Sequence, residues 1–194
     1  MSDGQHALDQ FLRNVTAGEE SSVTVEVHPN LEYINLRGDA ADTEFVSATN
    51  KILRQEIPLE ANTISTGIST IYWLGPDEWL IVTPGGERPT LQTLLDDALS
   101  GMHASLNVVT GGQVAMRISG DNATAVLAKG CTLDLHPKTF HPGQCAQTGL
   151  AKASILIGKV DDDPTFDIFI RRSFAEYLAL WLQHAGAGYG IRFE

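Results

Sequence analysis

The chain has 194 residues, of which 43% are hydrophobic and 19% are charged, proportions typical of a globular protein. Its formal net charge is −11, from 13 basic and 24 acidic residues. A nucleic-acid-binding surface needs clustered Lys and Arg to displace counterions, and an anionic membrane surface selects for basic segments, so both partners are excluded.

The N-terminal segment, residues 1–20, is predicted to be an arm that precedes the first subdomain. Leu8, Phe11 and Leu12 fit one short amphipathic helix, or an arm that orders only against a partner. The segment lacks the basic and apolar regions of a secretory signal, and no apolar run approaches the roughly 20 residues that cross a bilayer. With only two cysteines and no signal, we expect a reducing, cytoplasmic location.

The remainder of the chain repeats one pattern at an offset of about 82 residues. A strand-like run at 31–36 is followed by a Gly-Asp step, Gly38-Asp39, and then by a helical stretch. A second run at 114–118 is followed in the same way by Gly120-Asp121. In each half the acid is expected in the first helical turn, where it favours the helix dipole.

Further elements continue the repeat. SVTVEV (22–27) falls opposite ASLNVV (104–109), and hairpins are predicted at 68–83 and 151–171. Apolar spacing predicts a helix after each hairpin, and Tyr189–Phe193 is expected to add a short strand.

Each half therefore comprises strand, strand, helix, strand, strand, helix. The predicted fold is α+β, with two pseudo-repeated βαβ-type subdomains built on antiparallel sheets. The first subdomain is expected at 21–103 and the second at 104–194, together forming one compact unit.

The loop at 128–148 gathers Cys131, His136, His141 and Cys145 in the pattern C-x4-H-x4-H-x3-C. Two thiolates and two imidazoles could hold tetrahedral zinc, but the spacing is unlike that of zinc knuckles. The alternative is a structural crossover in which both cysteines are small buried apolar residues. A nucleophilic cysteine with His136 as its base lacks an oxyanion hole, so no metal or catalytic residue is assigned.

A dinucleotide-binding fingerprint is missing from the sequence. Gly111-Gly112 is only a turn, and residues 83–86 lack the spacing and the helix that such a motif requires. We therefore expect no site for FAD, FMN or NAD on this chain. Large aromatic side chains are instead expected in the core or as anchors for a partner: Tyr72, Trp73, Trp79 and Trp181.

Three motifs, WLGPDEWL (73–80), the 128–148 loop and PTFDIFIRRSFAEYLALWL (164–182), resemble the gamma subunit of heterotetrameric sarcosine oxidase. The resemblance runs from about Leu31 to Trp181. It implies a fold similar to the folate-binding fold of the glycine-cleavage T-protein. It also implies a complex that oxidises sarcosine to glycine with oxygen and passes the one-carbon unit to tetrahydrofolate.

By this resemblance the alpha subunit would carry NAD and folate, the beta subunit FAD and FMN, and the delta subunit zinc. This chain would be a non-flavin accessory subunit that packs against alpha. Two alternatives remain: a stand-alone folate-binding module of the aminomethyltransferase type, and a small zinc protein organised by residues 131–145. The loop acids Asp77, Glu78 and Asp134 do not match the T-protein carboxylate near folate, so no cofactor-binding residue is assigned.

Overall fold

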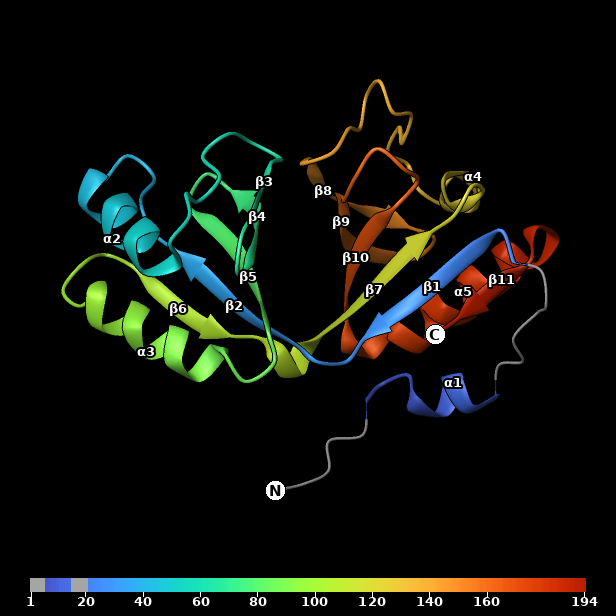
Figure 1. The fold of residues 1–194 in the computed structure, drawn as a ribbon, viewed down its shortest axis with the longest axis horizontal. Helices are drawn as coiled ribbons and strands as arrows, with labels where there is room; N and C mark the ends of the chain where they lie inside the picture. The colour runs from blue at the N-terminus through green and yellow to red at the C-terminus, as the bar shows by residue number, and fades with distance from the viewer. Residues whose placement is uncertain (1–5, 15–20) are drawn as a thin grey trace. The chain divides into compact units, whose positions relative to one another are not determined.

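The computed structural model describes residues 6–14 and 21–194. These divide into two compact units (Figure 1). Unit 1 comprises the described residues before Asn30 together with Gly112–Pro142 and Gln147–Glu194, and unit 2 comprises Asn30–Gly111 and Gly143–Ala146. The fold is α+β with two mostly antiparallel sheets, which confirms the predicted fold class.

Unit 2 contains a five-stranded antiparallel sheet with the order β3-β4-β5-β2-β6. Its elements are β2 (Leu31–Arg37), α2 (Thr43–Leu53), β3 (Ile64–Thr66), β4 (Thr70–Gly75), β5 (Glu78–Pro84), α3 (Arg88–Ala98) and β6 (Ser105–Val108). A short 3-10 helix, η1 (Thr110–Gly112), follows β6.

The core of unit 2 lies between this sheet and its two helices. Strand side chains alternate between the faces of a sheet, and every second residue of the central strands faces α2 and α3. In the register of β2 and β5, Leu36 lies opposite Trp79 and Ile34 lies opposite Ile81. The buried cluster comprises Ile34, Leu36, Phe45, Leu53, Ile57, Ile71, Trp79, Ile81, Leu95 and Leu99.

Unit 1 contains a six-stranded sheet with the order β11-β1-β7-β10-β9-β8. The β1–β11 pair is parallel, and the β1–β7, β7–β10 and β10–β9 pairs are antiparallel. Its elements are α1 (Asp9–Asn14), β1 (Val23–His28), β7 (Gln113–Ser119), α4 (Ala123–Ala128), β8 (Cys145–Leu150), β9 (Ala153–Lys159), β10 (Phe166–Arg171), α5 (Ala175–Gly186) and β11 (Ile191–Phe193). Two 3-10 segments, η2 (Arg172–Phe174) and η3 (Ala187–Tyr189), flank α5. The first two residues of β8 group with unit 2.

The predicted N-terminal helix is present as α1, and it packs on unit 1. Leu8 and Phe11 are buried, and the ring of Phe11 meets that of Phe193 edge to face with centroids 4.9 Å apart. Within residues 6–14 the segment is therefore part of the fold. Residues 1–5 and 15–20 of the predicted arm lie outside the described residues.

The repeat is present, but the first strand of each half, β1 or β6, pairs in the sheet formed by the other half. β1 pairs with β7 in the sheet of unit 1, and β6 pairs with β2 in the sheet of unit 2. The sheets therefore do not follow the predicted division at 103/104, because each leading strand joins the sheet of the other half. Each half also has an additional edge strand that the sequence did not predict, β3 or β8.

The hairpins and their turns lie where the sequence predicted them. β4 and β5 turn at Gly75–Glu78, and β9 and β10 turn through residues 160–165. The second turn wraps around the ammonium of Lys159, which donates to the carbonyl oxygen of Asp161 at 2.5 Å and to that of Asp163. The Lys159 ammonium also lies over the ring of Phe166, 5.0 Å from its centroid. A buried lysine is thus satisfied within its own hairpin.

The acid of the first Gly-Asp step, Asp39, lies in the turn before α2 and not in the first turn of the helix. Asp42, three residues after Asp39, is the N-cap of α2, and its carboxylate accepts hydrogen bonds from the N–H groups of Glu44 and Phe45. The carboxylate of Asp39 instead accepts from the Ala41 N–H in the preceding turn. The predicted position of the acid in the first helical turn is therefore wrong by one short turn.

Candidate functional site

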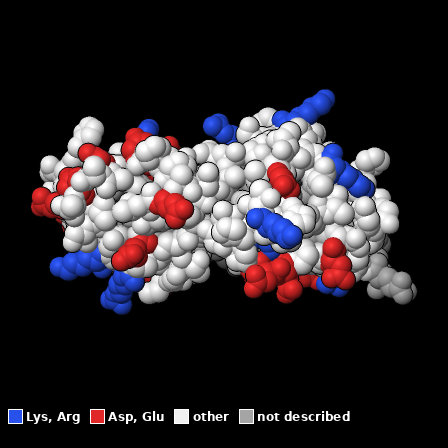
Figure 2. Space-filling model, turned by 90° about the horizontal axis from the view of Figure 1, so that it is seen from above, with Lys and Arg blue, Asp and Glu red and all other residues white. Residues whose placement is uncertain are grey.

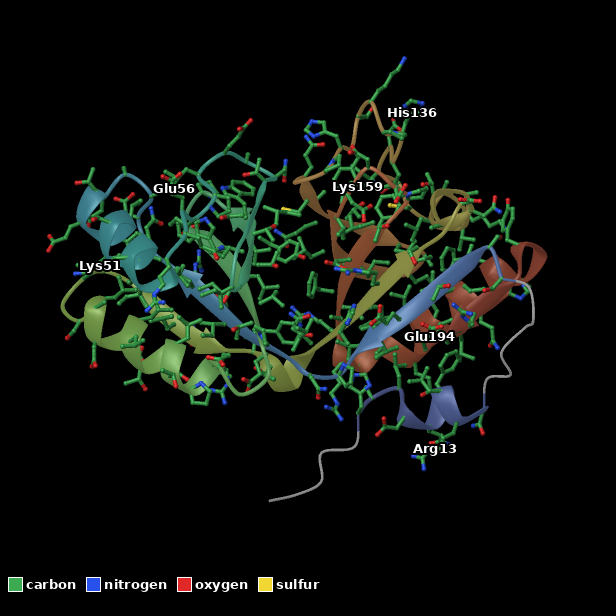
Figure 3. All side chains as sticks on the ribbon, viewed as in Figure 1. Arg13, Lys51, Glu56, His136, Lys159 and Glu194 are labelled. Atoms are coloured by element: carbon green, nitrogen blue, oxygen red, sulfur yellow. The ribbon has the colours of Figure 1, made fainter. Side chains whose placement is uncertain are left out.

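The 128–148 loop does not assemble the four residues that suggested a metal site. Cys145 is buried at the start of β8, Cys131 is half-buried, and both are free thiols. His136 and His141 are exposed, and Figure 3 shows His136 on the outer part of the loop. Across residues 6–14 and 21–194, no group of three or more His, Cys, Asp or Glu side chains is placed to hold a metal ion.

Apolar side chains hold the loop to unit 1. Leu135 and Phe140 are buried, and the Phe140 ring stacks parallel to that of Phe166 with centroids 6.5 Å apart. The carboxylate of Asp134 accepts a 3.0 Å hydrogen bond from the His136 N–H. That bond, together with one from the Thr139 side chain, lowers the pKa of Asp134. The loop is therefore a folded crossover fixed by its own contacts.

The thiol of Cys145 is held in a site that disfavours chemistry. Burial raises its pKa to about 11, and its sulfur lies 3.4 Å from the Thr63 carbonyl oxygen and 3.5 Å from that of Trp73. The thiolate is the reactive form of cysteine, and at neutral pH this side chain is almost entirely the thiol. This environment is that of a structural cysteine, and it does not favour the nucleophile interpretation.

The four aromatic residues singled out in the sequence are largely internal. Trp79 and Tyr72 are fully buried, whereas Trp73 and Trp181 are half-buried. The Trp181 ring packs against Gly130, where any β-carbon would overlap it. Exposed large apolar side chains lie elsewhere: Leu59, Ile68, Leu94 and Val108 in unit 2, and Val160, Phe174, Tyr177 and Leu180 in unit 1.

Two of those exposed residues border an apolar groove in unit 2. The groove, about 240 Å³ in volume, lies between the end of α2, the β3–β4 connection and α3. Ile68 and Leu94 line it, and Arg54 and Glu87 supply its charged groups. The groove has no signature in the sequence, because Ile68 belongs to a turn and Leu94 to the outer side of a helix.

A polar hollow of about 520 Å³ lies at the start of β6, where Arg37, Asp77 and His103 contribute to its wall. The guanidinium of Arg37 and the carboxylate of Asp77 form an ion pair at 2.8 Å. The Asp77 carbonyl oxygen also accepts from the Gly38 N–H at 3.1 Å. The cation that an anionic ligand would need is therefore already paired within the hollow.

A third hollow, of about 530 Å³, is bordered by the segment from Glu56 to Ser65 and by α2. Two carboxylates, those of Glu56 and Glu60, and the exposed Leu59 give this hollow an acidic and apolar character. It is broad and open, and no basic residue lines it. An acidic ligand is therefore disfavoured there.

Basic side chains do not gather into a patch on the surface drawn in Figure 2, where single Lys and Arg residues lie among acidic ones. This distribution offers no stripe for a phosphate backbone on that face. In residues 6–14 and 21–194, no helix combines the length and the hydropathy that spanning a bilayer would require.

The comparisons with known proteins agree with these features. Residues 37–188 match the family described as "Sarcosine oxidase, gamma subunit family". Sarcosine oxidase subunit gamma of Corynebacterium sp. (strain P-1) is 25% identical over 181 residues, 93% of this chain and 87% of that protein. The subunit gamma of Arthrobacter sp. has the same identity and coverage.

Two solved structures share the fold. The heterotetrameric sarcosine oxidase from Corynebacterium sp. U-96 matches with a TM-score of 0.84 and 24% identity, covering 94% of this chain and 93% of the matched chain. Glycine cleavage system aminomethyltransferase T from Bartonella henselae matches with a TM-score of 0.66 and 16% identity, covering 90% of this chain and 48% of that one. Because the family match extends over most of the sequence, the chain belongs to the sarcosine oxidase gamma subunit family.

Proposed function

We propose that this chain is the gamma subunit of a heterotetrameric sarcosine oxidase, where it has a structural role and contributes no catalytic residue. The observation that carries the proposal is the family match over residues 37–188. The relatives named sarcosine oxidase subunit gamma, which align with nearly the whole chain, support the same assignment.

The reaction of the complex follows from the resemblance of the sequence motifs to this family. The complex would oxidise sarcosine to glycine with oxygen and transfer the one-carbon unit to tetrahydrofolate. FAD, FMN, NAD and zinc would be held by the other subunits, and the alpha subunit would be the direct partner of this chain.

The chemistry of the described side chains supports a structural role. The buried Cys145 is protonated at neutral pH, and the Arg37 guanidinium is paired with Asp77. Several large apolar side chains are exposed in each unit, including Ile68 at 67% and Leu180 at 51%. Ile68 and Leu94 border the same groove, and contiguous exposed apolar groups are typical of surfaces that become covered in an assembly.

The test is to purify the tagged chain from its own cells grown on sarcosine. A large native mass, flavin absorbance in the visible spectrum and sarcosine-dependent peroxide production are expected together. A colourless protein eluting at the 21.0 kDa of the chain alone would overturn the proposal.

The alternative, a stand-alone folate-binding module, is motivated by the fold shared with the aminomethyltransferase, which is a likeness of fold only. Calorimetric titration of the isolated chain with tetrahydrofolate separates the two. The structural-subunit proposal expects no binding heat, whereas stoichiometric binding would favour the folate module.

A further inference from the structure

The two sheets differ at one edge, although the units repeat the same order of strands. In unit 1 the order β8-β9-β10-β7-β1 is continued by β11, which pairs with the outer edge of β1. In unit 2 the equivalent order is β3-β4-β5-β2-β6, so β6 is the counterpart of β1, and the sheet ends there. Among the described residues, no strand occupies the position beside β6 that β11 occupies beside β1.

The pairing of β11 with β1 shows how an added strand binds at this edge of the sheet. β11 runs parallel to β1, with Val23 opposite Ile191 and Val25 opposite Phe193. The Val25 carbonyl oxygen accepts a 2.9 Å hydrogen bond from the Glu194 N–H, and the Val27 N–H donates to the Glu194 carbonyl oxygen, also at 2.9 Å. The outward backbone groups of Val25 and Val27 therefore bind the added strand.

The corresponding groups of β6 follow from its register. Val25 lies opposite Ile118 of β7, and Leu106 lies opposite Leu36 of β2, so Leu106 is the counterpart of Val25. By the same register, Val108 is the counterpart of Val27.

The direction of the β6 backbone groups follows from one hydrogen bond between the segment after β6 and β2. The Val109 N–H donates to the Tyr33 carbonyl oxygen at 3.0 Å, which makes this a hydrogen-bonded pair of the antiparallel ladder. Such pairs alternate, so Asn107 and Ser105 direct their backbone groups toward β2. Leu106 and Val108 direct theirs away from β2, toward the open edge.

The composition of this edge does not protect it. Natural edge strands commonly carry charged residues, proline or a bulge, which prevent pairing with another chain. β6 is short, with the four residues SLNV, but it has no charged residue, proline or bulge, and its pairing with β2 is regular. Val108 is 43% exposed, which leaves an apolar side chain beside the unpaired backbone.

We infer that the free edge of β6 binds an extended segment of another subunit of the complex, parallel to β6, as β11 binds β1. The inference rests on the proposed function as a subunit of that complex. The incoming segment would pair with both outward backbone groups of Leu106 and with the Val108 N–H, and an apolar residue of it would cover Val108. A second copy of this chain is a poorer fit, because a two-fold axis would pair two β6 edges antiparallel.

Amide hydrogen exchange tests the inference on the chain alone and in the purified complex. The Leu106 and Val108 amides are expected to exchange rapidly in the lone chain and to become protected in the complex. The Asn107 amide, directed toward β2, serves as the internal control, and it should be protected in both.

The outcomes separate this inference from the proposed function. If the tagged chain recovers no complex, the proposed function itself fails. If it recovers the complex but Leu106 and Val108 exchange as fast as in the lone chain, only strand addition is overturned. Protection of both amides in a dimer of the lone chain would overturn the choice of partner.

A pair of substitutions provides a second test. Val108→Pro removes the outward N–H, a position where an edge strand tolerates proline, whereas Val108→Thr keeps it. Val108→Pro is expected to weaken recovery of the complex about tenfold relative to Val108→Thr, with closely similar melting of the two lone chains. Equal recovery by the two variants would contradict the inference.

Discussion

The indole N–H of Trp79 donates a 2.7 Å hydrogen bond to the carbonyl oxygen of Pro58 inside the core of unit 2. Trp79 is fully buried, and its ring lies 5.8 Å from that of Phe45. One side chain thus fills the space beneath α2 and also satisfies a carbonyl of the segment that follows α2.

Replacing Trp79 with Phe removes that donor and part of the ring. We expect the free energy of unfolding of the isolated chain to fall by about 2–4 kcal/mol, since a buried carbonyl loses its partner and a cavity opens. Urea unfolding measures the change. Trp73→Phe, at a half-buried position, is the matched control and should cost less; an equal loss would contradict this account.

Glu32 gives the stability of unit 2 a dependence on pH. Burial of this carboxylate raises its pKa, but hydrogen bonds from the Gly86 N–H and from Arg88 outweigh that effect and lower it below the ordinary value of 4.5. A carboxylate with a lowered folded-state pKa stabilises the fold above its unfolded pKa, and the contribution is lost as pH falls through the folded pKa.

Glu32→Gln should therefore lower the free energy of unfolding by about 1–2 kcal/mol at pH 7, because the substitution removes the charge from the hydrogen bonds with Gly86 and Arg88. Below pH 4.5 the difference from wild type should shrink. Denaturant titrations at pH 7 and at several acidic values provide the measurement. A difference that is constant with pH would show that the charge of Glu32 is not responsible.

The sequence predicted the elements better than their partners. Hydrophobic periodicity and turn residues located both hairpins and both helices that follow them, because these signals are local. The sequence did not predict that β1 joins the sheet of unit 1 and β6 that of unit 2, because the residues of a strand do not determine locally which of two similar sheets it joins. The pairing of Val25 with Ile118 spans nearly half of the chain and has no local signature.

In the 128–148 loop, too, the sequence pattern did not predict which side chains lie close together. The spacing of Cys131, His136, His141 and Cys145 correctly marked an unusual loop, but spacing alone does not give the direction of a side chain. Leu135 and Phe140 turn inward and hold the loop, while the intervening histidine is exposed. Two apolar residues in a polar loop were the available signal for a fixed crossover.

The two cysteines should differ in reactivity toward iodoacetamide. Burial raises the pKa of Cys145 to about 11, so little thiolate forms at pH 8, and the side chain is shielded from solvent. Cys131 is only half-buried. Mass spectrometry should find Cys131 modified first in the folded chain, with both modified at similar rates in denaturant. Modification of Cys145 as fast as Cys131 in the folded chain would contradict its burial.

Removal of metal should leave this chain unchanged. Structural zinc contributes directly to folding, and chelators unfold proteins that depend on it. Within the described ranges, no three potential ligands are placed together. The melting temperature of the isolated chain is therefore expected to be the same with and without EDTA. A decrease in EDTA that added zinc reverses would restore the zinc interpretation of residues 131–145.

Gly120 and Gly143 both adopt positive φ, at 108° and 82°, but their surroundings differ. A β-carbon at Gly120 would lie 2.3 Å from the backbone oxygen of Ser22, whereas one at Gly143 would meet nothing within 4 Å. Gly143→Ala should cost only the backbone strain, about 1–2 kcal/mol. Gly120→Ala adds a backbone overlap where β1 begins, so a larger loss of about 3–5 kcal/mol is expected in urea unfolding. Equal losses would mean that the backbone at Ser22 moves away from Gly120 at little cost. The close approach of Ser22 to Gly120 would then not constrain the pairing of β1 with β7.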